Sequence, residues 1–192
     1  MRFPLEGEAL AERARLLETL HSLTDDEFNG GPTLCAEWAP RDVLGHLIGV
    51  DDLTTYARRF GVGAANAAQV ARARELSRED LMKRAEQWAA RPSATSRFAA
   101  AFLLGDLSIH HQDILRGLGR TREVPPPVAA AILREGAFVL SPVYNRRILR
   151  YKVIPTDDGR ALGRGREVRG TREQLGMWLA GRDTLSDELT FA

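Results

Sequence analysis

The segment Phe98-Ala-Ala-Ala-Phe-Leu-Leu-Gly-Asp-Leu-Ser-Ile-His-His-Gln-Asp-Ile-Leu-Arg-Gly-Leu118 is the most informative part of the chain. It has no proline and few residues that disfavour helices, so the sequence predicts one long helix here. Asp106, His110 and Asp113 recur at i, i+4 and i+7, which places them on one stripe of that helix. A buried charge without a partner is costly. A metal ion would satisfy both the carboxylate and the imidazole.

The composition describes an ordinary globular protein. Its 192 residues are 44% hydrophobic and 28% charged, enough for one domain, with or without a small appendage. The formal net charge is +1 and the basic residues are interspersed with acids, so we expect no nucleic-acid partner. The single cysteine, Cys35, excludes an internal disulfide and a cysteine-based zinc knuckle.

The N-terminal residues lack the apolar core of a signal peptide, and no apolar window is long enough to span a membrane. We therefore predict a cytoplasmic protein without a membrane partner. A homodimer is an open alternative to a monomer.

Apolar periodicity and capping signals predict a helical bundle over residues 1–140. Thr24 and Ser77 each begin a capping-box pattern, while Pro92 ends a helix. Residues 61–76 are compatible with either a loop or a helix. The predicted helices span Glu6 to about Leu20, Pro40 to about Phe60, 77–91, a long one from Ser93 or Ser96 to Gly117 or Gly119, and 127–140.

Residues 141–192 have a different character and predict a small α/β module. Residues 147–155 are rich in β-branched and aromatic residues, and the turn signal at 156–159 precedes a returning strand over 161–168. Thr171 is the expected N-cap of a last helix, and 189–191 a short closing strand. The predicted architecture is mainly α, a bundle with a small α/β C-terminal appendage.

His46 is the polar member of an otherwise apolar, core-facing row on the helix that begins at Pro40. His46, Asp106 and His110 on facing helices would form a three-ligand metal site with one coordination position left for water or substrate. The alternative for each histidine is a hydrogen-bonded core residue.

Asp113, His111 and Cys35 are further polar residues near these positions. Asp113 would either orient a ligand histidine or bond a neighbouring backbone group. His111 lies about 100° around the helix from His110 and is predicted to be a surface or rim residue. Cys35 is either a nucleophile or an inert, partly buried small residue. No catalytic residue is assigned.

The segment Thr33-Leu-Cys-Ala-Glu-Trp38-Ala-Pro-Arg41-Asp42-Val-Leu-Gly-His46-Leu resembles the opening motif of the mycothiol-dependent maleylpyruvate isomerase-like family. The segment from Asp106 to Asp113 is similar to the second signature of that family, although Asp106 stands where the family usually has glutamate. Residues 156–159, 168–170 and 175–182 resemble its C-terminal module.

This resemblance implies a DinB-like up-down four-helix bundle whose metal is held by His46, Asp106 and His110. It also implies Zn²⁺, with Ni²⁺ or Mn²⁺ as alternatives, and a mycothiol-like thiol as cosubstrate. A metal-bound thiolate would add to an activated double bond in an isomerisation, or displace a leaving group in an S-transfer. An arginine such as Arg41 or Arg182 would hold a substrate carboxylate, and the sequence does not choose among the arginines present. The alternatives are a non-catalytic metal-binding module with a binding or stress-response role, and a purely structural bundle.

Overall fold

The computed structural model describes residues 3–51, 62–139 and 146–192. They form two compact units, residues 1–100 with 110–122 and residues 101–109 with 123–192. The long helix α8 (Ala100–Gly117) contributes to both units. The predicted domain boundary near residue 140 stays a prediction.

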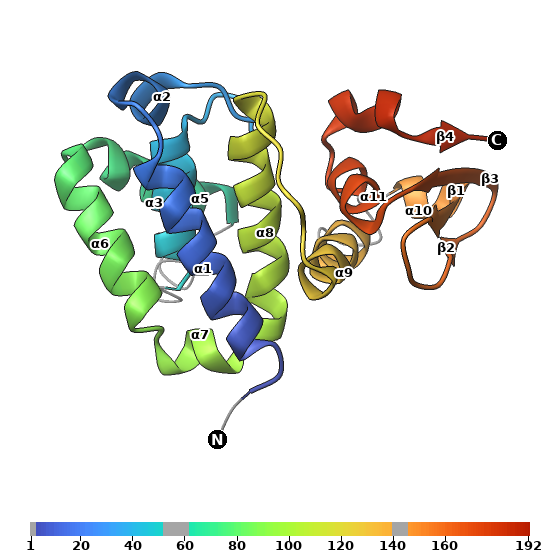
Figure 1. The fold of residues 1–192 in the computed structure, drawn as a ribbon, viewed down its shortest axis with the longest axis horizontal. Coiled ribbons are helices and arrows are strands. Elements are labelled where there is room, and N and C mark those ends of the chain that lie inside the picture. Colours follow the sequence, from blue (N-terminus) through green and yellow to red (C-terminus); the bar gives the residue numbers. More distant parts are fainter. Residues whose placement is uncertain (1–2, 52–61, 140–145) are drawn as a thin grey trace. The chain divides into compact units, whose positions relative to one another are not determined.

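The first unit is a helical bundle (Figure 1). Helix α1 packs against α6, and α3 packs against α5 and α6. Its core consists of fully or almost fully buried aliphatic and aromatic side chains, among them Leu16, Leu44, Leu81 and Ile114. The helices are α1 (Glu6–His21), α2 (Asp25–Gly30), α3 (Pro40–Val50), α5 (Val62–Arg74), α6 (Arg78–Ala90), α7 (Ala94–Phe98) and the second half of α8.

The local signals of the sequence explain where these helices begin. The Thr24 hydroxyl accepts from the Glu27 N–H in a capping box, and Ser77 and Ser93 accept from the N–H groups of Asp80 and Ser96. The predicted long helix is divided at Ala99 into α7 and α8. Residues 62–74 are helical, and the end of the helix predicted over 40–60 lies outside the described residues.

Two glycines let α3 and α5 approach closely. A Cβ added at Gly45 would lie 2.2 Å from the Ala73 Cβ, and one at Gly49 would lie 2.4 Å from the Gln69 Cγ. A side chain at Gly45 would force the helices apart, and one at Gly49 would displace the Gln69 side chain, because such distances are far below van der Waals contact. Small residues on α3 thus bring α5, and Gln69 with it, against the helix that carries His46.

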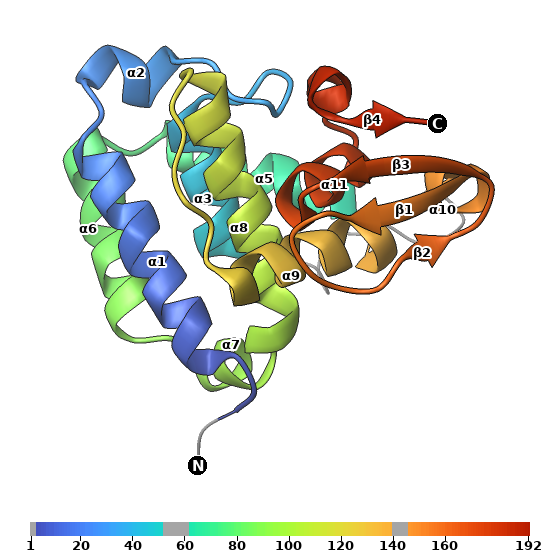
Figure 2. The same ribbon diagram turned by 45° about the vertical axis from the view of Figure 1, so that its right-hand side comes forward.

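The second unit contains a small mixed sheet with helices packed on it (Figure 2). The strand order is β2-β1-β3-β4, with β1 (Tyr151–Pro155) parallel to β3 (Arg166–Gly170) and Val153 opposite Val168. Strands β2 (Leu162–Gly163) and β4 (Thr190–Phe191) pair antiparallel to β1 and β3. The helices are α9 (Pro126–Arg134), a π-helical turn (Glu135–Val139), α10 (Arg146–Arg150), α11 (Arg172–Leu179) and a 3-10 turn (Asp183–Glu188).

The predicted returning strand over 161–168 is two strands in the structure. Gly163 and Gly165 have φ values of 73° and 109°, and these left-handed conformations turn the chain between β2 and β3. Val153, Val168, Leu175 and Trp178 form the core between the sheet and α11. The predicted combination of helices and strands in the C-terminal part of the chain is confirmed. None of the helices in the described ranges has the length and apolar character needed to cross a membrane.

Candidate metal centre

The loop before α3 is fixed by its own hydrogen bonds. The Thr33 hydroxyl donates to the Trp38 carbonyl oxygen at 2.7 Å, lies 3.1 Å from the Cys35 carbonyl oxygen, and accepts from the Cys35 N–H. The Leu34 N–H donates to the Asp113 carbonyl oxygen on α8 at 3.0 Å. Gly117 makes this approach feasible, because a Cβ there would lie 2.4 Å from the Thr33 Cα. The loop therefore holds Cys35 and Trp38 against the second half of α8.

His46 is buried on α3 and is oriented by Gln69 of α5. The His46 Nδ1 lies 3.0 Å from the Gln69 Oε1. Because an amide oxygen only accepts hydrogen bonds, His46 donates through Nδ1 and carries its lone pair on Nε2. That tautomer is the one suited to metal ligation through Nε2. Sequence reasoning missed Gln69, since nothing in the sequence of α5 connects it to α3.

His110 is also buried, and the carboxylate of Asp113 orients it. The His110 Nδ1 lies 2.9 Å from the Asp113 Oδ2, one turn further along α8. The same Oδ2 accepts a hydrogen bond from the Cys35 thiol at 3.0 Å, and the Cys35 sulfur lies 3.4 Å from the His110 Nδ1. Asp113 therefore makes the side-chain contact proposed as one of its two alternatives from the sequence. Cys35 belongs to this cluster, which its spacing in the sequence did not indicate.

The two histidine rings and one indole form an aromatic group at this site. The ring centroids of His46 and His110 are 4.9 Å apart at an interplanar angle of 79°. The Trp38 centroid lies 5.3 Å from that of His46 and 6.0 Å from that of His110. The tryptophan of the loop thus lies beside both imidazoles.

Asp106 precedes His110 by one turn of the same uninterrupted helix. One ligand atom from each of His46, Asp106 and His110 lies within 4.8 Å of the corresponding atoms of the other two. Cys35, His110 and Asp113 form a second set with the same spacing, so the two sets share His110. Two imidazole nitrogens and one carboxylate oxygen are a donor set that zinc accepts. The side chain of Asp106, although shorter than that of glutamate, brings its carboxylate close to both imidazoles.

His111 is completely buried, so the prediction of a surface or rim position was wrong. Its Nδ1 donates to Glu12 of α1 at 2.8 Å, and its Nε2 accepts from the Thr19 hydroxyl at 2.8 Å. Burial lowers the pKa of His111, which keeps the ring neutral. Both ring nitrogens are used within the bundle, and His111 is therefore excluded from the ligand sets.

The Arg41 side chain has a structural role. It donates to the carbonyl oxygens of Ala73 and Leu76, at 2.8 and 2.7 Å, and to the Asn29 side chain. These contacts tie the end of α5 to α2 and α3. The Arg41 guanidinium is thus already engaged by the bundle itself.

The mainly helical architecture with a small C-terminal sheet is that of a DinB-like fold. Residues 9–101 match the family described as "Mycothiol maleylpyruvate isomerase N-terminal domain". The sequence resemblance is thereby confirmed.

Two solved structures show the same fold over both units. They are crystal structures of the mycothiol-dependent maleylpyruvate isomerase and of a histidine-to-alanine mutant of it, with TM-scores of 0.66 and 0.65. Each similarity covers 99% of this chain and 93% of the other, at 16% sequence identity. At that identity the similarity establishes the fold. No curated protein sequence matches the chain.

Proposed function

We propose that the protein is a metal-dependent enzyme that uses a low-molecular-weight thiol of the mycothiol type for isomerisation or S-transfer. The observation that carries this proposal is the convergence of His46, Asp106 and His110 within ligand distance of one another. The family of residues 9–101 and the two similar structures support the same chemistry, since both are named for a mycothiol-dependent isomerase.

In this proposal His46, Asp106 and His110 hold a divalent ion, with Zn²⁺ preferred and Ni²⁺ or Mn²⁺ as alternatives. The ion would supply the Lewis acidity that lowers the pKa of an added thiol. Gln69 and Asp113 keep the two imidazoles in the tautomer with the lone pair on Nε2. Trp38, beside both rings, would restrict the access of water to them.

The shared ligand His110 makes the choice between the two donor sets testable. We assign the ion to the set with two imidazoles, because the His110 Nδ1 is already directed at Asp113. Asp106→Asn should then abolish stoichiometric binding, whereas Cys35→Ser should leave it intact. The reverse result would assign the ion to Cys35, His110 and Asp113.

Metal analysis of the purified protein, loaded with Zn²⁺ and desalted, tests the centre itself. We expect about one ion per chain. His46→Ala and His110→Ala should both lose it. His21→Ala is the matched control, because His21 is exposed and pairs with Glu86 at the surface. A protein that binds no divalent ion would contradict the proposal.

A second experiment separates catalysis from binding alone. The loaded protein would be assayed with mycothiol and other small thiols against cis-configured unsaturated ketoacids and alkyl halides. Thiol-dependent turnover that His46→Ala removes would support the enzyme. Stoichiometric metal without turnover over the whole panel would favour the non-catalytic module. The cytoplasmic location and the oligomeric state stay predictions.

A further inference from the structure

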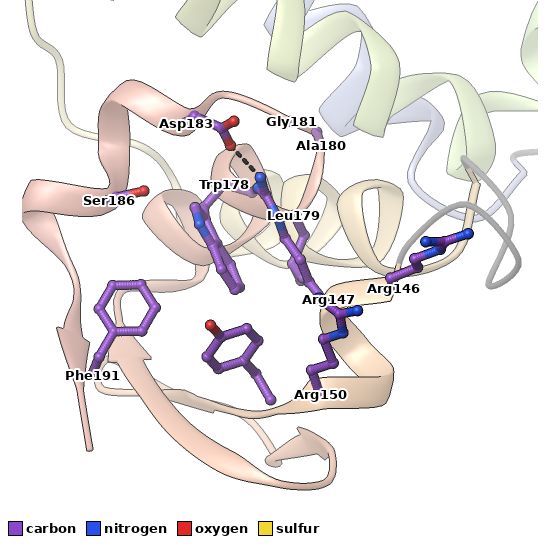
Figure 3. A pocket seen from close by; sticks show the side chains of 11 residues that line it. Arg146, Arg147, Arg150, Trp178, Leu179, Ala180, Gly181, Asp183, Ser186 and Phe191 are labelled. Atoms are coloured by element: carbon purple, nitrogen blue, oxygen red, sulfur yellow. Dashed lines mark hydrogen bonds and ion pairs between the residues drawn. The ribbon is translucent and has the colours of Figure 1, made fainter.

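The second unit has a pocket of its own, with a volume of about 740 Å³, beside α10 and α11 (Figure 3). Tyr151, Trp178 and Phe191 come from three different elements and form an aromatic wall. Their ring centroids are 5.4 to 5.8 Å apart, with each pair edge to face. This geometry fixes the rings in a rigid arrangement, because each ring supports the other two.

Three guanidinium groups line the same pocket. Arg147 lies over the Trp178 ring, at 4.6 Å from its centroid, and also contacts Asp183 and the Trp178 carbonyl oxygen. Within the described residues, the guanidinium groups of Arg146 and Arg150 make no hydrogen bond or ion pair. Figure 3 shows Arg146 directed away from the Trp178 ring. Arg150 is therefore the cation best placed to meet a ligand that contacts the aromatic wall.

The charges of the lining residues favour an anion. Three arginines and one aspartate, Asp183, give a net charge of +2 (three positive less one negative). The Asp183 carboxylate is largely exposed and already paired with Arg147. A planar guanidinium binds a carboxylate through two parallel hydrogen bonds, and neighbouring aromatic rings favour a flat, apolar body.

We propose that this pocket binds an aromatic carboxylate, with the carboxylate on Arg150 and the ring system against Trp178 and Phe191. A volume of this size lies within the usual range for small-molecule sites, roughly 300–1,000 Å³. The site shares no residue with the candidate metal centre, and the proposal stands whether or not the chain is a thiol-dependent enzyme.

Calorimetric titration of the full chain with three probes tests both halves of the proposal. The probe 2-naphthoate has a ring system and a charge, 2-naphthamide has only the ring system, and acetate has only the charge. We expect saturable one-site binding of 2-naphthoate, and binding at least about tenfold weaker for each of the others.

Arg150→Met should weaken the binding of 2-naphthoate by about tenfold or more, because the exposed guanidinium is replaced by a neutral chain. Arg160→Met is the matched control, since Arg160 is exposed in the turn after β1 and does not line the pocket. Circular dichroism of both variants would verify the fold. Absence of 2-naphthoate binding, equal binding of 2-naphthamide or acetate, or an equal loss in both variants would overturn the proposal.

Discussion

Glu12 of α1 and His111 of α8 form a hydrogen-bonded pair in the interior of the bundle. The Glu12 Oε1 lies 2.8 Å from the His111 Nδ1, and both side chains are completely buried. Arg122 adds contacts to both carboxylate oxygens of Glu12. Burial alone would raise the pKa of Glu12, but the hydrogen bonds of His111 and Arg122 and the positive charge of Arg122 lower it from 4.5 to about 2.

The first prediction concerns acid stability. Since the pKa of Glu12 is lower in the folded than in the unfolded state, its contribution is fully present above pH 4.5. This contribution to stability is lost as the pH falls from about 4.5 to the pKa of Glu12 in the folded state, which is about 2. A difference of this size corresponds to about 3 kcal/mol of unfolding free energy. Urea unfolding over this pH range should show that decrease.

Glu12→Gln provides the matching test. It should reduce the unfolding free energy at pH 7 by about 3–5 kcal/mol, because the largely buried guanidinium of Arg122 loses the negative charge of its partner Glu12. It should also flatten the pH dependence between pH 4.5 and 2. Glu18→Gln on the exposed face of α1 is the control. An unchanged acid profile in Glu12→Gln would refute the role assigned to this carboxylate.

The bundle helices were largely predictable because their signals are local. The capping residues Thr24 and Ser77 and the apolar repeats of α1 and α6 specify helices without reference to distant residues. The proximity of Asp106 and His110 was also predictable, since helical spacing places them on one face of α8. The burial of His111 was not predictable, because it depends on Glu12, 99 residues away in the sequence. The contact of Gln69 with His46 was not predictable either, because it depends on the packing of α5 against α3.

The second prediction concerns Gln69, which orients His46 through the bond to Nδ1. Gln69→Met keeps the volume but removes the acceptor, so the affinity for Zn²⁺ should fall by about 10–100-fold. Gly49→Ala should act in the same direction, because its Cβ would displace the Gln69 side chain. Competition with a fluorescent chelator measures both. Gln87→Met, an exposed position on α6, should bind as tightly as the unaltered protein.

The third prediction separates a ligand from the residue that orients it. Asp113 accepts from both the Cys35 thiol and the His110 ring, and it is completely buried. Asp113→Asn should weaken Zn²⁺ binding by about 10–100-fold and preserve a stoichiometry near one. Chelator competition would give the affinity, and metal analysis at saturation the stoichiometry. Complete loss of binding in Asp113→Asn, with binding retained in Asp106→Asn, would exchange the roles of the two aspartates.

The fourth prediction compares one substitution at two glycines. Gly176 on α11 faces α9 at backbone contact, and an added Cβ would lie 2.6 Å from the Ile132 carbonyl carbon and oxygen. Because backbone atoms have no rotamer to adopt, the helices must shift, and Gly176→Ala should destabilise the protein by about 1–3 kcal/mol. Gly7, in the first turn of α1, has no atom within 4 Å of an added Cβ. Gly7→Ala should therefore stabilise the protein by about 0.4–1 kcal/mol, through the reduced entropy of the unfolded chain.

Chemical unfolding followed by far-ultraviolet circular dichroism would measure both variants against the unaltered chain. The sign of the change in unfolding free energy tests the prediction, because the same methyl group is added to a helix in both variants. A stabilising Gly176→Ala would show that α9 and α11 can separate without loss, and that the close contact of their backbones contributes nothing to the second unit. A destabilising Gly7→Ala would show instead that the start of α1 requires the freedom of glycine.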